Sequence, residues 1–354
     1  MDEMKRHLLV LVVSIFVVSA AHAENTLDVY WVDVEGGGAT LIVTPAGQSI
    51  LIDTGNPGTR DAGRIHEVAT KLAKLKKIDF LITTHFHGDH FGGAATLAQL
   101  MPIGIVNDNG IPVRNPDRHR QDPAFVLKVR PYRSMKVDGR VVVKPGYKLP
   151  LKQAEGASPV SLTIVAANRK FIDPPKGAKK NLLAGSVPKQ KEDLSDNANS
   201  VCSLVTLGNF RFLDCGDLTW NMEAKLVEPM NRIGTVDVYQ VNHHGLASSN
   251  NPLLIKSVAP TVSVMNNGHT KGCTPGSFAA LKSAKSIKAM YQVHRNLRPD
   301  GDKNNTDNDY IANLTPRDDC KAHTLKMSVT ADGKSYTLSN PRSDHKRTFK
   351  TRKH

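Results

Sequence analysis

Short apolar runs and one long amphipathic stretch divide the first hundred residues. The apolar runs have the length of strands and lie between glycine-rich turns, so they predict strands at residues 29–34, 39–45, 48–52 and 78–83. Apolar side chains recur at helical spacing over 60–77, which predicts a helix, and a second helix is expected at 92–100. Strands and helices therefore alternate, a pattern typical of an α/β domain.

The second half of the chain continues this alternation around one clear hairpin. Gly208 and Asn209 separate two β-rich runs, which is the signal of a two-residue hairpin turn. Beyond it the pattern predicts a helix and two buried strands, at residues 221–228, 236–241 and 261–265. A terminal β-hairpin is predicted from two strand-like runs around residues 331–333, at 324–330 and 334–339.

Positive charge is concentrated in the middle of the chain. The formal net charge is +14, and residues 114–191 hold 18 Lys and Arg against 5 Asp and Glu. Lys- and Pro-rich loops interrupt the strand-like pieces there, so residues 110–199 are interpreted as a basic elaboration of the same domain. Such a surface favours anionic partners such as phosphoesters, acidic polymers or nucleic acid. The alternative is a generally basic exported protein.

The first residues have the pattern of a secretory signal peptide. Lys5 and Arg6 precede an apolar run at 8–20, which ends in Ala21-His22-Ala23. We therefore expect residues 1–23 to be removed by cleavage after Ala23 and the mature protein to be periplasmic or secreted. An uncleaved anchor is the alternative. No later segment is apolar enough to predict a membrane span.

The four cysteines then fall in a compartment that permits disulfides. Counting outward from the hairpin turn, Cys202 faces Cys215 at a non-hydrogen-bonded pair, where cross-strand side chains are closest. This register predicts a disulfide, and two small buried residues are the alternative. Cys273 and Cys320 remain, and the sequence leaves open whether they meet.

A cluster of histidines follows the predicted strand at 78–83. His85 and His87 alternate at the exit of that strand, so both side chains point to one side, and Asp89 and His90 follow where the chain must turn. Imidazole and carboxylate groups on a rigid strand end suit Zn2+ or another borderline divalent ion. We therefore expect a metal site here. Asp53 follows an apolar strand and is expected to hold a ligand histidine from behind.

This cluster resembles the defining His-x-His-x-Asp-His motif of the metallo-β-lactamase superfamily, and Leu51-Ile52-Asp53-Thr54-Gly55 is similar to its early Asp-x-Gly turn. In that family, the positions of His85 and His87 bind one metal ion, and those of Asp89 and His90 bind a second. The resemblance implies a four-layer αββα sandwich with two divalent ions, expected to be Zn2+, at one edge. It also implies a hydrolase that uses a metal-bound hydroxide.

Later segments carry the resemblance further. Residues 213–218 are similar to the segment whose aspartate, here Asp217, bridges the two ions. His243-His244-Gly245 is similar to the segment that closes the second metal site, which makes both histidines expected ligands. Asp89 and Asp217 are the residues expected to have catalytic roles, Asp89 by orienting the nucleophile.

The closer match is to the metallo-β-lactamase-like domain of the ComEC competence family, over roughly residues 27–294. Residues 33–39 resemble its opening Asp-Val-Gly-x-Gly-Asp turn, and residues 197–200 resemble its Asn-x-x-Ser segment. Two features depart from the pattern. Gly38 replaces the acidic residue of the turn, and the only histidine between the main motif and Asp217 is His119, which we interpret as a surface residue. The first metal site is then short of a ligand, or completed by water, Asn197, Ser200 or Asp108.

These observations divide the chain into the main domain at 24–300, a C-terminal hairpin extension at 301–342 and a basic tail at 343–354. The first hypothesis is a hydrolase of an anionic ester, either a phosphodiester or a nucleic-acid-like substrate. The second is a lactone or β-lactam hydrolase of the same fold, and the third is a binding module with weak or no catalysis. Residues expected on the substrate side are Asn197, Ser200, His269 and His294.

Overall fold

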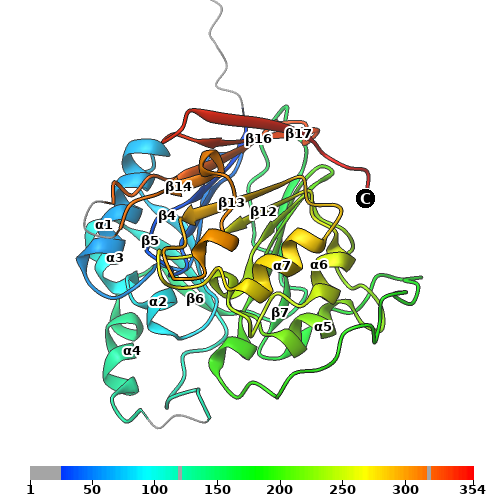
Figure 1. Cartoon of the computed structure of the whole chain (residues 1–354). Helices are drawn as coiled ribbons and strands as arrows, with labels where there is room; N and C mark the ends of the chain where they lie inside the picture. The colour runs from blue at the N-terminus through cyan, green and yellow to red at the C-terminus, as the bar shows by residue number, and fades with distance from the viewer. Residues whose placement is uncertain (1–24, 119–121, 317–319) are drawn as a thin grey trace, which may run out of the picture.

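Two sheets face each other, and helices cover the outer face of each (Figure 1). The computed structural model describes residues 25–118, 122–316 and 320–354, so the expected signal peptide lies outside the described residues. Within these residues, the first sheet has nine strands in the order β17-β16-β15-β1-β2-β3-β4-β5-β6. The second has eight, in the order β14-β13-β12-β11-β10-β9-β7-β8. The predicted four-layer αββα fold is confirmed.

The elements have the following bounds. The first sheet contains β1 (Leu27–Trp31), β2 (Thr40–Val43), β3 (Ser49–Ile52), β4 (Ile78–Thr83), β5 (Ile103–Asp108), β6 (Gly139–Val142), β15 (Leu325–Val329), β16 (Ser335–Asn340) and β17 (His345–Lys350). The second contains β7 (Val160–Ala167), β8 (Lys170–Phe171), β9 (Cys202–Leu207), β10 (Phe210–Asp214), β11 (Val238–Gln240), β12 (Val262–Met265), β13 (Ala289–His294) and β14 (Ile311–Asn313). The α-helices are α1 (Thr59–Glu67), α2 (Gly88–Phe91), α3 (Ala94–Leu100), α4 (Phe125–Ser134), α5 (Trp220–Val227), α6 (Pro252–Val258) and α7 (Pro275–Ser283).

Three apolar layers hold this sandwich together. The largest lies between the sheets and includes Ile50, Leu162 and Phe212. Helices α1, α3 and α4 bury their apolar faces against the outside of the first sheet, and α5, α6 and α7 do the same on the second. Burial of apolar surface on both faces explains why the central strands are nearly continuous apolar runs. The polar residues that follow β4, β10 and β11 gather at one edge of the sandwich.

Two segments differ from the sequence prediction. The helix expected over 60–77 ends earlier, because α1 passes into a π-helical turn at Val68–Leu72 and Lys74 then has a positive φ of 57°. The stretch 110–199, expected to be an elaboration of the domain, also contributes to its core. It supplies β7, whose Leu162 and Ile164 are fully buried between the sheets. Its strand-like pieces therefore belong to the core.

The C-terminal residues 343–354, expected to be a basic tail, contain a strand. Residues 345–350 form β17, which pairs antiparallel with β16, so the terminal hairpin becomes a three-stranded edge joined to β1 through β15. Phe349 stacks on Tyr336 with ring centroids 5.4 Å apart. The neighbouring Lys346, Arg347 and Lys350 are exposed or half-buried. One buried aromatic residue in alternation with cations is a weak strand signal, which explains why the prediction was wrong.

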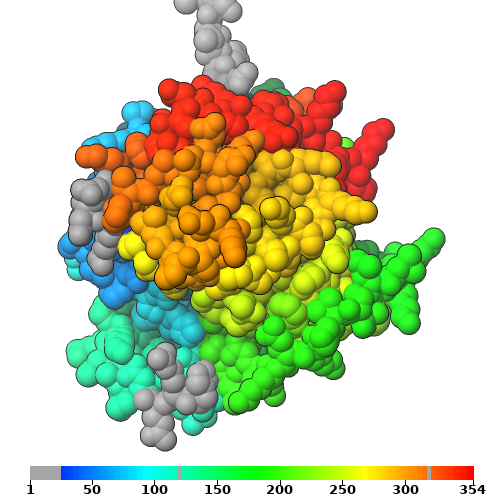
Figure 2. Space-filling model, viewed as in Figure 1, coloured from blue at the N-terminus to red at the C-terminus, as the bar shows by residue number. Residues whose placement is uncertain are grey.

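The loop between β8 and β9 projects from the side of the molecule. It is drawn in green and stands out beside α5 in Figures 1 and 2. Asn181 N donates to Pro229 O at 2.8 Å, and Trp220 Nε1 donates to Pro188 O at 3.1 Å, which anchors the loop to α5 and the segment after it. Among the described residues, no helix is both long enough and apolar enough to cross a membrane.

Candidate metal centre

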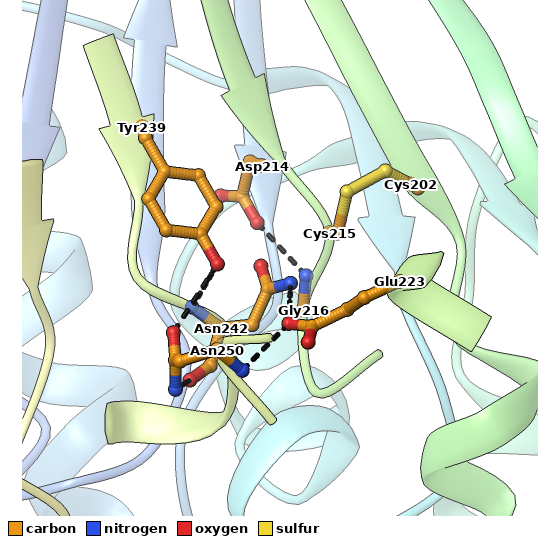
Figure 3. The surroundings of a disulfide bond; sticks show 8 residues. All are labelled: Cys202, Asp214, Cys215, Gly216, Glu223, Tyr239, Asn242 and Asn250. Atoms are coloured by element: carbon orange, nitrogen blue, oxygen red, sulfur yellow. Dashed lines mark hydrogen bonds between the residues drawn. A yellow bond between two sulfur atoms is a disulfide. The ribbon is translucent and has the colours of Figure 1, made fainter. Parts of the chain in front are cut away.

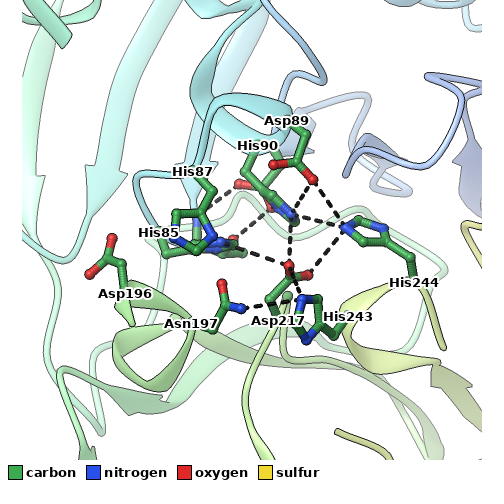
Figure 4. A network of polar contacts seen from close by, with 12 residues as sticks. His85, His87, Asp89, His90, Asp196, Asn197, Asp217, His243 and His244 are labelled. Atoms are coloured by element: carbon green, nitrogen blue, oxygen red, sulfur yellow. Dashed lines mark hydrogen bonds and ion pairs between the residues drawn. The ribbon is translucent and has the colours of Figure 1, made fainter. Parts of the chain in front are cut away.

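Three strand ends converge at the edge where the polar residues gather (Figure 4). His85, His87, Asp89 and His90 follow β4, Asp217 follows β10, and His243 and His244 follow β11. Strands β10 and β11 are parallel neighbours, so the segments after them leave the second sheet side by side. The first sheet therefore contributes one wall of the centre, and the second contributes the other.

Asp217 lies at the middle of this cluster. Its Oδ2 is 3.2 Å from His90 Nε2, 3.4 Å from His243 Nε2 and 3.8 Å from His85 Nε2, and its Oδ1 is 3.5 Å from His244 Nε2. A carboxylate surrounded by imidazoles on both sides can serve two ions at once. Asp217 is expected to bridge two ions, which stays a prediction, and the structure places its carboxylate among these four imidazoles.

The side chains form two donor sets that share Asp217. The first set is His85, His87 and Asp217, and the second is Asp89, His90, Asp217 and His244. Within each set, one ligand atom from every residue lies within 4.8 Å of all the others. His85 Nε2 is buried and has no hydrogen-bond partner, although it points at the shared carboxylate. An orphaned buried imidazole nitrogen in a set of His and Asp fits a divalent metal ion.

Electrostatics hold the carboxylates of the centre ionised. Burial opposes ionisation of Asp217, but His90, His243 and His244 outweigh it and keep the Asp217 pKa well below its usual range. Burial lowers the pKa of His85 well below that of a free histidine, and burial likewise lowers the pKa of His243 to about 4. Burial opposes protonation of His87 and His90, but the neighbouring carboxylates outweigh it and raise the pKa of both rings, so these two ligands must release a proton when a metal ion binds.

A layer of hydrogen bonds fixes the ligand side chains from behind. Asp53 Oδ2 lies 2.7 Å from His90 Nδ1, the place expected for it from the sequence, and Asp53 Oδ1 accepts from Thr84 N at 2.8 Å. Asp117 Oδ1 lies 3.0 Å from His87 Nε2, which leaves His87 Nδ1 to face the centre. Such outer partners set the ring orientation and the tautomer of a metal-binding histidine.

Gly38 is required by this layer. A Cβ at position 38 would lie 2.8 Å from His90 Nδ1 and 2.9 Å from Asp53 Oδ2, closer than real Cβ atoms approach other atoms. The acidic residue of the ComEC-type turn therefore does not fit here unless the His90–Asp53 pair moves. The departure noted in the sequence has a local steric cause.

The turn that carries His243 and His244 is held in an uncommon backbone conformation. Both residues have positive φ, 53° and 54°, which non-glycine residues seldom adopt. Glu223 of α5 stabilises the turn, because its Oε1 accepts from Asn242 Nδ2 at 2.6 Å and from Asn250 N at 2.8 Å (Figure 3). This strain stays in place because a fully buried carboxylate holds both ends of the loop.

The predicted disulfide is present on the same side of the centre. Cys202 and Cys215 are joined between β9 and the end of β10, two residues before Asp217 (Figure 3). Cys273 and Cys320 are free and do not pair with each other. Cys273 Sγ contacts Asn304 O, and Cys320 Sγ contacts Asp33.

Comparison with known proteins agrees with this geometry. The family model described as the metallo-beta-lactamase superfamily matches residues 33–172. Over these residues, the chain is similar to that superfamily. The match includes the His85–His90 motif and ends before Asp217, His243 and His244, which the fold brings to the same edge.

Curated relatives match this chain over short stretches. A "UPF0173 metal-dependent hydrolase" of Cupriavidus metallidurans is 38% identical over 96 residues, which cover 26% of this chain and 30% of that protein. A protein of the same name from Polynucleobacter asymbioticus is 34% identical over 146 residues, 39% of this chain and 45% of the relative. The chain thus spans less than half the length of either relative.

Solved structures show remote similarity. CmlA, a diiron β-hydroxylase from Streptomyces venezuelae, has 16% identity and a TM-score of 0.41, with 76% of this chain and 53% of that chain covered. A diphosphatase from the PhnP family has 13% identity and a TM-score of 0.35, with coverage of 68% and 87%.

Some expected residues lie elsewhere in the metallo-beta-lactamase fold. His244 belongs to the second donor set, whereas His243 belongs to neither set. His294, expected on the substrate side, is fully buried, and its Nε2 lies 2.6 Å from Asp33, which also pairs with Arg64. Hydrophobic and polar neighbours cover His294 completely, so its side chain is not accessible to a substrate. The positions of His243 and His294 correct the sequence interpretation, whereas that of His244 agrees with it.

The other candidates are placed as follows. Asn197 lies beside His243 in the centre, and Ser200, just after it, is buried with no hydrogen-bond partner for its Oγ. His269 is half-buried, with its ring 5.9 Å from that of His294. Asp108 bonds Tyr132 and Gly110 N, outside both donor sets. His119 lies outside the described residues.

Sequence reasoning missed three charged residues of the centre. Asp117 supports His87, Asp196 Oδ2 accepts from Phe86 N at 2.6 Å, and Lys271 Nζ pairs with Asp89. Asp117 and Asp196 lie in the irregular basic stretch, and Lys271 lies in a loop after β12. Their neighbours in sequence carry no recognisable motif, so the only signal was an acidic residue within a basic segment.

A cavity of about 850 Å³ opens beside the two donor sets. Its walls include the ligand candidates His87 and Asp89, with Phe91, Phe125, Asp117 and Lys128. Ligand sites in enzymes are typically concave and mostly apolar, with a few polar groups that fix orientation. The reacting part of a substrate would meet the ligand residues here, while the rest of the substrate lies against aromatic walls.

Proposed function

We propose that the protein is a metal-dependent hydrolase with two divalent ions, expected to be Zn2+, held by the two donor sets that share Asp217. The observation that carries the proposal is the position of the Asp217 carboxylate, between His85 on one side and His90 and His244 on the other. Imidazole and carboxylate donors suit Zn2+ among divalent ions. The names of the curated relatives give further support.

Residues of the chain hold and orient the candidate metal ligands for the proposed hydrolysis. Divalent ions held by the two donor sets would supply Lewis acidity, to activate a water molecule and to polarise the scissile group. Asp53 and Asp117 fix the rings of His90 and His87, so the donors are organised before substrate arrives. Lys271 pairs with Asp89 and orients its carboxylate toward His90 and His244. We assign Asp89 and Asp217 the catalytic roles, Asp89 because it lines the cavity and Asp217 because it belongs to both donor sets.

The first candidate substrate is an anionic ester, a phosphodiester or a nucleic-acid-like polymer. The net charge of +14 supports it, because a basic surface attracts anions and speeds their encounter. The basic stretch is spatially divided, however. Lys128 lines the cavity, whereas the loop that carries Lys176, Lys179 and Lys180 is anchored to α5 and the segment that follows it.

The second candidate is a neutral cyclic ester or amide, such as a lactone or β-lactam. The lining of the cavity favours it, because Phe91 and Phe125 supply apolar wall, Asp117 adds negative charge, and Asp122 pairs with Lys128 at 2.8 Å. Carboxylates in the lining disfavour an extended polyanion. The ComEC-type likeness stays a prediction.

A salt titration separates the two candidates. We expect kcat/KM for a chromogenic phosphodiester to fall between low and moderate ionic strength, because exposed charges are screened within about 10 Å at 0.1 M salt. Lys128→Gln should flatten that dependence, and the matched variant with Lys176, Lys179 and Lys180 changed to Gln should not. A flat profile with rapid turnover of a lactone would favour the second candidate. Bound metal without turnover of phosphodiester, lactone or β-lactam would favour a binding module.

We also propose that the protein acts outside the cytoplasm. The basic and apolar leader with its Ala21-His22-Ala23 ending supports export, and so does a disulfide between Cys202 and Cys215. Intact mass of the protein recovered from the periplasm or medium should place its first residue at Glu24. An intact Met1 on cytoplasmic material would contradict export.

A further inference from the structure

The first donor set has fewer protein ligands than the second. It contains His85 and His87 besides the shared Asp217, whereas the second contains Asp89, His90 and His244. A catalytic zinc ion usually has three protein ligands and one open position. With Asp217 divided between two ions, the first set lacks a donor of its own.

Asn197 is positioned to fill this gap. Its side chain is 94% buried, and its Oδ1 has no hydrogen-bond partner among the described residues. Figure 4 shows its amide next to Asp217 and His243, on the side of His85. A buried amide oxygen without a partner is destabilising, so such an atom in a polar centre calls for a ligand.

The contact with His243 sets the direction of the amide. Asn197 Nδ2 lies 3.2 Å from His243 Nε2, while His243 Nδ1 lies 3.0 Å from Ser248 Oγ. If Nδ1 carries the proton and donates to the hydroxyl, the Nε2 lone pair accepts from the Asn197 amide. The amide nitrogen is then engaged and the carbonyl oxygen is turned away from His243. This arrangement also explains why His243 belongs to neither donor set.

The backbone around Asn197 is fixed to the segment of the first donor set. Asp196 precedes it in the short 3-10 helix Asp196–Asn199, and its Oδ2 accepts from Phe86 N, between His85 and His87. Asp196 N donates to Asp117 Oδ1 at 2.8 Å, and the same oxygen faces His87 Nε2. Movement of Asn197 relative to the two histidines would therefore break this network.

We propose that Asn197 Oδ1 is the third unshared protein donor of the first metal ion, beside His85 Nε2 and His87 Nδ1, while Asp217 is shared by both ions. The inference rests on the metal centre of the proposed function. An amide oxygen is a harder donor than a third imidazole, so this set binds hard divalent ions such as Mn2+ better, relative to Zn2+, than three histidines do. Asn197→His should reverse that preference and tighten Zn2+.

Metal affinity of the full chain tests the proposal. Zn2+ stoichiometry and chelator competition should show two equivalents in the wild type. Asn197→Ala should weaken one of them at least 10-fold and leave the other unchanged, because the second donor set keeps all its residues. Asn197→Asp keeps an oxygen donor and should retain both equivalents. Asn107→Ala is the matched control, because Asn107 is also fully buried with an unpartnered Oδ1 but touches neither donor set.

The outcomes are distinct. A wild-type chain that binds no metal contradicts the proposed function itself. A chain that binds two ions, with Asn197→Ala indistinguishable from wild type, overturns only this inference, and a loss in His119→Ala instead would identify the histidine as the donor. If Asn197→Ala fails to fold, a crystal structure of the zinc-loaded wild type decides. Oδ1 should lie about 2.0–2.2 Å from the first ion. Water or another side chain in that place would overturn the proposal.

Discussion

Replacement of Asp217 by alanine should remove at least one of two bound metal equivalents and leave the fold largely intact. Its carboxylate belongs to both donor sets and lies within 3.8 Å of four imidazole nitrogens. Without it, each set loses a donor and the imidazoles lose the charge that attracts a cation. Loss of an outer partner of a ligand typically costs 10–100-fold in affinity or activity, so loss of this shared ligand should cost more than about 100-fold in kcat/KM.

Metal analysis of purified Asp217→Ala, with hydrolysis measured on the best substrate, checks this result. Asp237→Asn is the matched control, since Asp237 is equally buried but pairs with Arg352 and His354 at the C-terminus. That control should keep its full metal content. Asp217→Asn should behave like the alanine variant, because a neutral amide keeps the shape and loses the charge. Full metal content in Asp217→Ala would show that the shared carboxylate was wrongly assigned.

Most of the sandwich could be predicted from local pattern. The apolar runs before His85, Asp217 and His243 became β4, β10 and β11, because burial on both faces leaves few polar positions in such strands. The edge strand β17 could not be predicted, because its exposed face is cationic and only Phe349 is buried. An edge strand needs few apolar residues, so whether such a segment forms a strand depends on the partner strand with which it pairs.

The candidate site likewise contains some residues that the sequence could indicate and others that it could not. His85, His87, Asp89 and His90 lie within six residues and form a recognisable group, so the local sequence is enough to indicate a metal site. Asp117, by contrast, reaches His87 across 30 positions of irregular chain. The separation of His243 from His244 depends on two positive φ angles and on Glu223, 20 residues away. Contacts of this kind follow from tertiary packing, which spacing alone does not reveal.

Removal of the disulfide should produce the largest loss of stability. Cys202 and Cys215 are separated by 13 positions, and a cross-link that closes a loop of about 15 residues is worth about 3 kcal/mol, chiefly because it restricts the unfolded chain. The double variant Cys202→Ala, Cys215→Ala should therefore lower the free energy of unfolding by about 3 kcal/mol. Cys273→Ala, which removes a buried thiol without a bridge, is the matched control and should lose less.

Addition of a reductant distinguishes the contribution of the disulfide to stability from that of side-chain packing. Urea unfolding of the wild type should shift to the midpoint of the double variant when dithiothreitol is added, whereas the double variant should not respond. Because Cys215 lies two residues before Asp217, weaker anchoring of the β10 end should also lower metal affinity in the reduced protein. Peptide mapping without reductant should recover the two cysteines in one linked fragment. Free thiols at both positions, with an unfolding midpoint that reductant does not move, would contradict the bridge and leave packing as the function of the pair.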